Sequence, residues 1–555
     1  MFRRPILLPI LLLLASCHPA DMYNVILRNG TLYDGSGLPP IQADIAISGD
    51  TIAAICEPGQ LTASVEIDAT GLAIAPGFIN MLSWADESLI EDGQSQSDIR
   101  QGVTLEVFGE GTSDGPLNKS MKQELIRTQG DIKYKVSWTT LREYLDYLVD
   151  RGVSCNIASF IGATTVRIHE VGFEDRKPTP EELSRMKQLV REAMEEGAVG
   201  LASSLIYPPA CYSNTDELIE LAKVAAEYDG LYISHIRSEG DQLIAGLNEL
   251  VRITKDAGIR SEIYHLKAAG QKNWLKMDLA IALIDSARAA GLPVTADMYT
   301  YTAAATGLGA CFPPWVQEGG HDAWIKRLKD PKIRSRLIEE ISEPGDNWEN
   351  FYDLAGTPDN ILACGFTDDS LKKFTGKTLT EISAIRKTSP IETMMDLIVQ
   401  NDGNVSAAYF LMSEQNVKKQ ICLPYVSFCS DSGSLSPEGV FLKSNPHPRA
   451  YGTFARLLGK YVRDEKVITL EEAVKRLTSL PAGNLRLAKR GLLKPGYFAD
   501  IVLFNPDSIG DRATFANPHQ FATGMVHVFV NGKQVLKNGE HTGAKPGRVA
   551  ARLKN

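Results

Sequence analysis

The chain has 555 residues, of which 44% are hydrophobic and 23% are charged, and its formal net charge is −10 at pH 7. This length allows more than one folded unit and a large buried core. The negative charge argues against the basic surface that nucleic-acid binding needs, so we expect no nucleic-acid partner. It also repels anionic ligands at long range, so local Lys or Arg side chains must hold an acidic substrate.

The first residues have the pattern of an export signal. Two arginines precede an apolar run from Ile6 to Leu14, which is too short to span a bilayer, and the run ends in the sequence LASC at residues 14–17. This ending resembles a bacterial lipobox and predicts that residues 1–16 are a lipoprotein signal peptide, with lipid attached to Cys17. We therefore expect an exported protein, lipid-anchored in the bacterial periplasm; His18 is compatible with the outer membrane. The alternative is an ordinary signal peptide with a chance cysteine.

Both ends of the remaining chain have the residue pattern of antiparallel strands. Short β-branched runs broken by Asn-Gly and Gly-Asp turns appear near the start, in MYNVILRNGTLYDGSG and ADIAISGDTIAAI. The same pattern returns near the end, in ADIVLFNP and MVHVFVNGKQVLKNG. We predict that residues 22–75 and 487–547 form one small β-sandwich domain, which the rest of the chain interrupts.

Residues 76–486 alternate strand and helix patterns. The helical pattern is clearest in TPEELSRMKQLVREAMEEG, where Thr179 suits the N-cap, Pro180 the first turn, Glu182 a capping box and Gly197 the C-terminal stop. Eight strand–helix units predict an α/β fold of the (β/α)8 TIM-like class. The strand candidates are LAIAPGFIN, GVTLEVFG, GVSCNIASFIG, GAVGLASS, GLYISHI, IRSEIYHLK, LPVTADMY and PYVSFCSD.

The stretch around residues 307–420 is too long for a simple connection between a strand and a helix. It has helical patterns of its own, such as LTEISAIRKTSPIETMMDLIVQN. We interpret it as an insertion near the crossover from the seventh to the eighth barrel strand, where it would lie at or beside the site.

Three strand candidates end in an ionisable side chain: the fifth in His235, the sixth in His265 and the eighth in Asp431. Active sites of such barrels lie at the carboxyl ends of the strands, so these side chains should converge at one mouth. Two imidazoles and a carboxylate are typical of a metal-dependent hydrolase. The plainer interpretations are satisfied polar residues at strand ends, and a turn or helix cap for Asp431.

From about Met22 to Arg552 the chain resembles the D-aminoacylase (N-acyl-D-amino-acid deacylase) branch of the amidohydrolase superfamily. The resemblance implies metal-dependent hydrolysis of the amide bond of N-acyl-D-amino acids, giving a carboxylate and a D-amino acid. Two alternatives stay open: a D-aminoacyl dipeptidase or other periplasmic amide hydrolase, and a catalytically inactive ligand-binding homologue. The stretches that match, in the family's order, are APGFIN, LIYPPACYSNTDEL, SHIRSE, YHLKAAG, TADMYTYTA, CSDSGS, HPRAYGTFAR, LTSLPAGNL, GYFADIVLF and RATFANPHQ.

The resemblance implies a zinc site held by His235, His265 and a third ligand at the end of the second strand. The family's third ligand is a cysteine in an Asn-Cys-Gly run, but this sequence has Phe-Gly-Glu-Gly at residues 108–111. Glu110 is a suitable substitute, since zinc accepts Glu with two His, and the related N-acetylglucosamine-6-phosphate deacetylases resemble this arrangement. Glu106 is a weaker candidate, and a turn carboxylate is the plainer interpretation of Glu110.

The family's second metal position needs an HxH motif at the end of the first strand. The matching residues are Leu82, Ser83 and Trp84, none of which is a normal zinc ligand. We therefore expect one Zn²⁺ per chain, or none if the protein is an inactive homologue. Asp431 is then the candidate general base, which takes a proton from the attacking water and gives it to the leaving amine.

The resemblance also implies that the substrate has a carboxylate and that Tyr207, Lys267 and Arg449 hold it. A guanidinium binds a carboxylate in bidentate fashion, and a lysine adds a point charge. Tyr299 either donates to the carbonyl oxygen as it becomes an oxyanion or packs in the core. The plainer roles are an ion pair at the barrel mouth for Lys267 and a loop anchor for Arg449. Oligomeric state is left open.

Overall fold

The computed structural model describes residues 23–345 and 347–553. The signal peptide predicted for residues 1–16 and the lipid site predicted at Cys17 lie outside the described residues. Among the described helices, none combines the length and the apolar character that crossing a bilayer would require.

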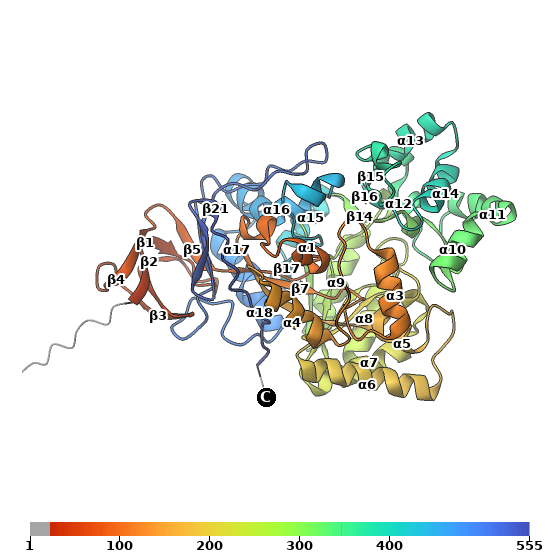
Figure 1. Cartoon of the computed structure of the whole chain (residues 1–555). Helices are drawn as coiled ribbons and strands as arrows, with labels where there is room; N and C mark the ends of the chain where they lie inside the picture. The colour runs from red at the N-terminus through yellow and green to blue at the C-terminus, as the bar shows by residue number, and fades with distance from the viewer. Residues whose placement is uncertain (1–22, 346, 554–555) are drawn as a thin grey trace, which may run out of the picture.

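Parallel strands close into a barrel, which confirms the predicted fold class (Figure 1). One run of neighbours is β6–β7–β8 and the other is β9–β10–β11–β12–β13–β17; β8 and β9 are one strand interrupted at Phe160, so eight strands surround the axis. The ring closes where Asp431 N donates to Leu82 O at 2.9 Å. The strands are β6 (Phe78–Asn80), β7 (Val103–Phe108), β8 (Asn156–Ser159), β9 (Ile161–Gly162), β10 (Gly200–Ser204), β11 (Leu231–His235), β12 (Arg260–Ile263), β13 (Val294–Met298) and β17 (Val426–Phe428).

Helices surround the barrel, and their ends follow local sequence signals. In α6 the predicted capping box is present: Glu182 N donates to Thr179 Oγ1 at 3.2 Å, and Thr179 N donates to Glu182 Oε2 at 2.7 Å. Gly197 ends the helix with φ 114°, a conformation that favours glycine. The helices other than those of the insertion are α1 (Asp86–Glu91), α2 (Gln96–Ile99), α3 (Lys119–Thr128), α4 (Leu141–Arg151), α5 (Ala163–Glu170), α6 (Pro180–Glu196), α7 (Thr215–Glu227), α8 (Leu243–Ala257), α9 (Lys276–Ala289), α15 (Glu414–Ile421), α16 (Arg449–Arg456), α17 (Leu470–Leu477) and α18 (Ser479–Asn484).

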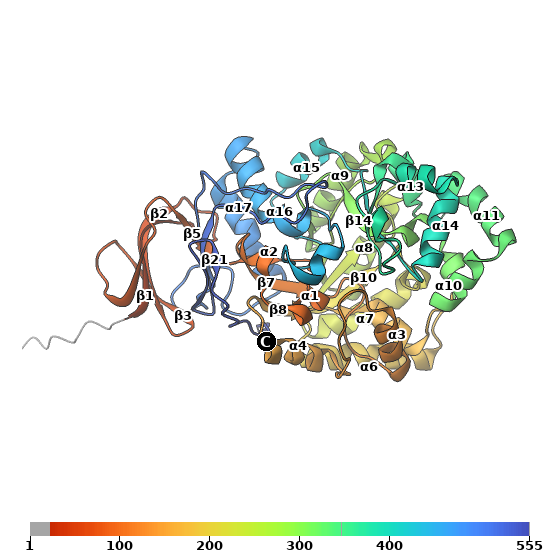
Figure 2. The same ribbon diagram turned by 45° about the horizontal axis from the view of Figure 1, so that its top comes forward.

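The two chain ends share one nine-stranded sheet beside the barrel, at the left of both views (Figures 1 and 2). Side chains alternate between its faces: Ile501 and Leu503 pack with Leu27 and Ile47 in a core of the sheet's own, whereas Val502 packs in the main barrel core. The sheet is therefore continuous through its hydrogen bonds, and side chains from both chain ends share one apolar core. Its strands are β1 (Tyr23–Leu32), β2 (Ile41–Ser48), β3 (Thr51–Cys56), β4 (Ala63–Asp68), β5 (Ala73–Pro76), β18 (Ile501–Phe504), β19 (Met525–Val530), β20 (Lys533–Lys537) and β21 (Glu540–His541).

The insertion follows the seventh barrel strand and has its own small sheet, helices and apolar core (Figure 2). Its sheet begins at Ala304, slightly before the predicted start, and its last strand ends at Tyr409. The next helix, α15, packs Val417 and Ile421 in the barrel core. Its elements are β14 (Ala304–Gly307), α10 (His321–Leu328), α11 (Pro331–Ser342), α12 (Phe351–Ala355), β15 (Ile361–Gly365), α13 (Leu379–Arg386), α14 (Pro390–Gln400) and β16 (Ser406–Tyr409).

Candidate metal centre and active site

Glu110 stands two residues beyond the end of β7, between two glycines whose backbone conformations fix its place. Gly109 has φ 104° and Gly111 has φ 71°, which side-chain-bearing residues rarely adopt. A Cβ on Gly111 would lie 2.5 Å from the Cβ of Ser204, and one on Gly109 would lie 2.6 Å from the carbonyl oxygen of Phe160. Within this turn, Glu110 is therefore the residue that can present a side chain to the barrel mouth.

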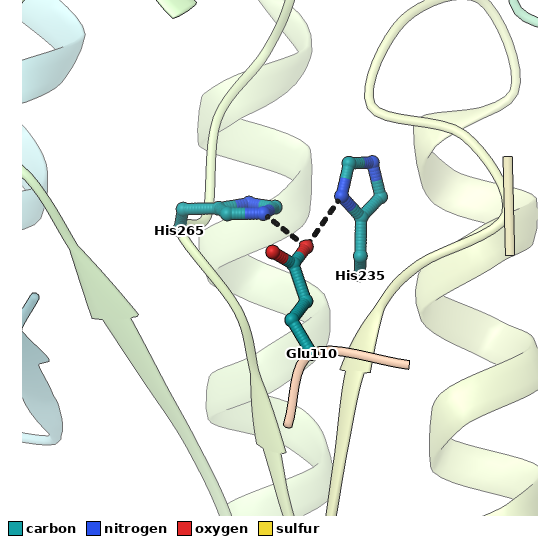
Figure 3. A group of neighbouring side chains, drawn as sticks. All are labelled: Glu110, His235 and His265. Atoms are coloured by element: carbon teal, nitrogen blue, oxygen red, sulfur yellow. Dashed lines mark hydrogen bonds and ion pairs between the residues drawn. The ribbon is translucent and has the colours of Figure 1, made fainter. Parts of the chain in front are cut away.

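The three predicted metal ligands lie together at the mouth (Figure 3). Glu110 Oε1 is 3.0 Å from His235 Nδ1 and 3.0 Å from His265 Nε2. One ligand atom from each residue can be chosen so that all three lie within 4.8 Å of one another, and all three residues are buried. Glu106, the weaker candidate, is buried elsewhere and accepts a hydrogen bond from Ser83 Oγ at 3.1 Å.

The electrostatics of this group favour a cation. Burial and the Lys267 charge act to lower the pKa of His265, but the carboxylates of Glu239 and Glu110 outweigh them and raise it to about 10. Burial likewise opposes ionisation of Glu110, yet its hydrogen bonds to His235 and His265 hold its pKa below the usual range. A carboxylate with two imidazoles is also a common donor set for zinc, so the residues present fit the ion that the sequence predicted.

Glu239 is a site residue that the sequence reasoning missed. It is buried, its Oε1 lies 2.9 Å from His265 Nδ1, and its Oε2 lies 3.6 Å from His235 Nε2. Burial acts to raise its pKa, but Lys267 and the two histidines outweigh burial and keep the pKa below its usual range. Its position in the SHIRSE stretch, four residues after His235, was the available signal.

Lys267 lies inside this cluster. Its Nζ donates to Glu239 Oε1 at 2.5 Å and lies 2.7 Å from His265 Nδ1. The ammonium also lies 5.6 Å from the centre of the Tyr299 ring. Lys267 thus forms an ion pair at the barrel mouth, as its plainer interpretation expected. This is also the mouth at which a substrate carboxylate is expected.

Asp431 is held by one hydrogen bond and one ion pair from different segments. Trp84 Nε1 donates to its Oδ1 at 3.1 Å, and Arg449 Nη1 lies 2.7 Å from its Oδ2. Its φ of 49° is unusual for a residue with a side chain, as is the φ of 33° at His265. Burial raises the pKa of Asp431, and the Arg449 charge opposes that rise.

The positions matched to the missing HxH motif have other tasks. Leu82 is buried in the barrel core, and Ser83 Oγ donates to Glu106. The third position, Trp84, points its indole nitrogen at Asp431. No member of this triplet offers a normal zinc ligand, so the motif supplies none to a second metal.

The other predicted substrate-binding residues also face this mouth. Arg449 stacks over Tyr299, with 4.6 Å between its guanidinium carbon and the ring centre, while the Tyr299 hydroxyl contacts Met412 Sδ at 3.5 Å. Tyr207 donates from its hydroxyl to Thr306 Oγ1 at 2.9 Å and packs edge-on against His235. Tyr299 is therefore packed among buried side chains, as its plainer interpretation expected.

All the residues proposed as ligands, base or substrate contacts line one cavity of about 630 Å³. This volume lies within the range of about 300–1,000 Å³ for small-molecule sites. Its wall includes the insertion, through Ala304, Ala305, Thr306 and Gly307 of β14 and Phe351, Cys364, Ser406 and Ala407. The insertion thus contributes to the pocket as well as lying beside the barrel.

Comparison with known proteins places this architecture. Residues 428–536 match a family described as the amidohydrolase family. The chain is 32% identical to a D-aminoacylase of Alcaligenes xylosoxydans xylosoxydans over 96% of this chain and 98% of that protein. The N-acyl-D-glutamate deacylase of Bordetella bronchiseptica, solved with zinc and a phosphonate inhibitor that mimics the tetrahedral intermediate, is 30% identical, with a TM-score of 0.78 over 95% of this chain and 99% of that chain.

A D-aminoacylase structure described for its binuclear metal centre, with activation by one metal and attenuation by the second, is 29% identical and has a TM-score of 0.79. That match covers 96% of this chain and all of that one. The similarity runs over nearly the full length, and the barrel, the sheet from both chain ends and the buried metal-capable group agree with it. The chain therefore belongs to the D-aminoacylase family of the amidohydrolase superfamily.

Proposed function

We propose that this protein is a metal-dependent enzyme that hydrolyses the amide bond of N-acyl-D-amino acids, releasing a carboxylate and a D-amino acid. The observation that carries the proposal is the meeting of Glu110, His235 and His265 at the mouth of a barrel whose relatives include a zinc-containing N-acyl-D-glutamate deacylase. The cavity around this group also contains cationic side chains and a carboxylate suited to moving protons.

We propose one zinc ion per chain, held by these three side chains. A zinc ion bound there would polarise the amide carbonyl and lower the pKa of a water molecule. Glu239 would orient His265 through the contact at Nδ1, as carboxylates commonly do for metal-binding histidines.

Asp431 is the proposed general acid and base. It would accept a proton from the attacking water and deliver it to the nitrogen of the leaving amine as the amide bond breaks. Its environment suits both steps, because burial raises its pKa while Trp84 and Arg449 stabilise its ionised form. Proton transfer by a positioned side chain typically contributes about 100-fold to 10,000-fold to the rate.

Arg449, Lys267 and Tyr207 are the proposed contacts of the substrate carboxylate. Arg449 pairs with Asp431 through Nη1 and donates from Nη2 to the Ala305 carbonyl oxygen at 3.4 Å, so Nε and the second hydrogen of Nη2 are left for an incoming carboxylate. Its stacking on Tyr299 and the hydrogen bond from its backbone N to His447 Nδ1, at 3.0 Å, hold it rigidly. A preorganised guanidinium loses little freedom when it binds a carboxylate.

Two measurements together test this function. Chelator-treated, zinc-reconstituted protein should hold close to one zinc ion per chain, and His235→Ala and His265→Ala should lose it. The reconstituted enzyme should then hydrolyse N-acetyl-D-amino acids and not their L enantiomers. Turnover of D-aminoacyl dipeptides alone would shift the function to a dipeptidase, and zinc binding without any turnover would favour the inactive binding homologue.

We further propose that the protein is exported and anchored by lipid at Cys17, since a LASC sequence follows an arginine pair and a short apolar run. Metabolic labelling with a fatty-acid analogue in a bacterial host tests this. Labelling of the full chain that is lost in Cys17→Ser is the expected result, and equal labelling of both would contradict it.

A further inference from the structure

A second groove lies next to the metal-site cavity and is lined by α3, α5 and the start of α10 of the insertion, which are labelled in Figure 1. Its volume is about 510 Å³. The apolar part of its lining consists of Leu117, Met121, Leu125, Ile168 and Phe173. Leu117 is buried and the other four are only half-buried, so they leave apolar surface open to an occupant.

The groove and the metal-site cavity are neighbours that share one lining residue, Thr112. Thr112 is two residues after the proposed ligand Glu110, on the same loop beyond β7. An acyl chain that extends from the metal centre past Thr112 would therefore reach the apolar groove.

The barrel's geometry decides which end of a substrate points that way. Of the three proposed carboxylate contacts, Lys267 follows the sixth strand, Arg449 the eighth and Tyr207 the fourth. Thr112 follows the second strand and Thr164 begins α5 after the third, and both line the cavity. In a ring of eight strands the second and third lie opposite the sixth and seventh. An amide held at the centre, with its carboxylate toward Lys267, thus directs its acyl group toward the second strand and Thr112.

The polar groups of the groove do not oppose an alkyl occupant. Glu124 pairs with Arg127 at 2.5 Å, and Arg127 also lies 2.9 Å from His321 Nδ1, so these groups are satisfied by one another. Asp86 and Asp114 stand at the other rim, where burial raises the pKa of Asp86 to about 7 and raises that of Asp114 as well.

We propose that this groove is an acyl-chain subsite, which makes N-acyl-D-amino acids with medium or long alkyl chains better substrates than the N-acetyl compounds. The proposal rests on the proposed function and names the acyl half of its substrate. Each CH₂ that leaves water should strengthen binding by about fourfold, the factor that corresponds to about 0.8 kcal/mol. The gain should appear mainly as a lower KM, because the chain lies away from the reacting bond.

Chain-length series of one D-amino acid test the proposal in the zinc-loaded enzyme. The wild type should show kcat/KM rising from N-acetyl through N-butanoyl to N-octanoyl. Met121→Glu and Leu125→Glu place a charge in the groove on a helix that has no fully buried residue, so folding should be preserved. Both variants should raise KM for the N-octanoyl substrate at least tenfold and leave N-acetyl kinetics unchanged. Gln123→Glu, an exposed position on the same helix outside the groove, is the matched control.

Two results would overturn the subsite: no gain with chain length in the wild type, or equal losses for N-acetyl and N-octanoyl substrates in both variants. Failure of the proposed function is separable, because binding of octanoate and acetate can be measured by calorimetry without turnover. The groove requires octanoate to bind more tightly than acetate in the wild type and in Gln123→Glu, and requires Met121→Glu and Leu125→Glu to lose that difference. Equal binding of both acids by the wild type would contradict the proposed subsite, whatever substrate the enzyme hydrolyses.

Discussion

The indole Nε1 of Trp84 donates a hydrogen bond to Oδ1 of Asp431 at 3.1 Å. Trp84 occupies the third position of the triplet that replaces the HxH motif, so a neutral donor stands where the family has a metal ligand. Together with Arg449 on the other carboxylate oxygen, it fixes Asp431 at the mouth through protein groups of the chain itself. Trp84, which stands at one position of the absent HxH motif, thus helps to position the candidate base Asp431.

Trp84→Phe should alter the pH dependence of catalysis. Burial already raises the pKa of Asp431. The indole N–H stabilises the ionised form of this carboxyl, so removal of the indole should raise the pKa further. A hydrogen bond to a charged group contributes about 1.5–3 kcal/mol, which corresponds to a displacement of about one to two pH units. The acidic limb of the kcat/KM profile should therefore move to higher pH while zinc content stays the same. A profile that superimposes on the wild type would show that Trp84 does not tune Asp431.

Glu110→Gln and Glu106→Gln should separate the two carboxylates that the sequence offered as the third zinc ligand. Glu110→Gln removes the negatively charged ligand between His235 and His265, so dialysed protein should lose its zinc. Glu106 is fully buried, and burial with the Asp98 charge raises its pKa to about 8, so it is mostly protonated at pH 7 and Gln is a close mimic. Zinc content by mass spectrometry should thus be normal in Glu106→Gln; zinc loss in this variant with retention in Glu110→Gln would reverse the assignment.

The sequence predicted the barrel because the signals involved are local. Strand and helix patterns alternate along the chain, and α6 begins and ends where Thr179 and Gly197 indicated. Residues at strand ends converge by the geometry of a parallel barrel, so His235, His265 and Asp431 could be grouped without coordinates. The choice of Glu110 needed chemistry as well, because the family's cysteine is absent and zinc accepts a glutamate together with two histidines.

What the sequence could not supply is contact between distant segments. Trp84 and Asp431 are 347 residues apart, and only closure of the first strand against the eighth brings them together. Glu239 joins Lys267 across 28 residues, so its contacts arise only when the fifth and sixth strands pack side by side, although its place in the SHIRSE stretch was a signal. The packing of Val417 and Ile421 in the barrel core depends in the same way on residues that are remote in sequence.

Glu239→Gln should weaken zinc binding although it replaces none of the proposed zinc ligands. The carboxylate contacts His265 Nδ1 at 2.9 Å and pairs with Lys267, so the amide loses the charge that orients the imidazole and balances the lysine. Such supporting groups typically change metal affinity by about 10-fold to 100-fold. Competition with a fluorescent chelator should show a loss of this size. Glu249→Gln, which breaks the 2.9 Å pair of Glu249 with Arg237, is the control and should retain full affinity; equal losses in both would mean a general effect of destabilisation.

Glu262→Gln should change how stability depends on pH. Glu262 is buried in the barrel interior, accepting hydrogen bonds from Thr295 Oγ1 at 2.8 Å and Asn484 Nδ2 at 2.7 Å, and burial with the Asp297 charge raises its pKa to about 8. Between the unfolded pKa of about 4.3 and this value the folded chain holds a proton that the unfolded chain releases, so this contribution to stability is full below about pH 4 and falls as pH rises, by up to about 1.4 kcal/mol per pH unit.

A glutamine at position 262 cannot titrate, so the variant should lose this part of the pH dependence. Thermal unfolding at pH 5 and pH 8.5 would measure it: Tm of the wild type relative to that of Glu262→Gln should be higher at pH 5 than at pH 8.5. Glu181→Gln, on the exposed face of α6, serves as the control because its carboxyl is open to water, and its Tm should follow the wild type at both pH values. Parallel Tm curves for wild type and Glu262→Gln would mean that the buried carboxyl is ionised in the folded protein, stabilised by its three side-chain donors, the third being Ser427.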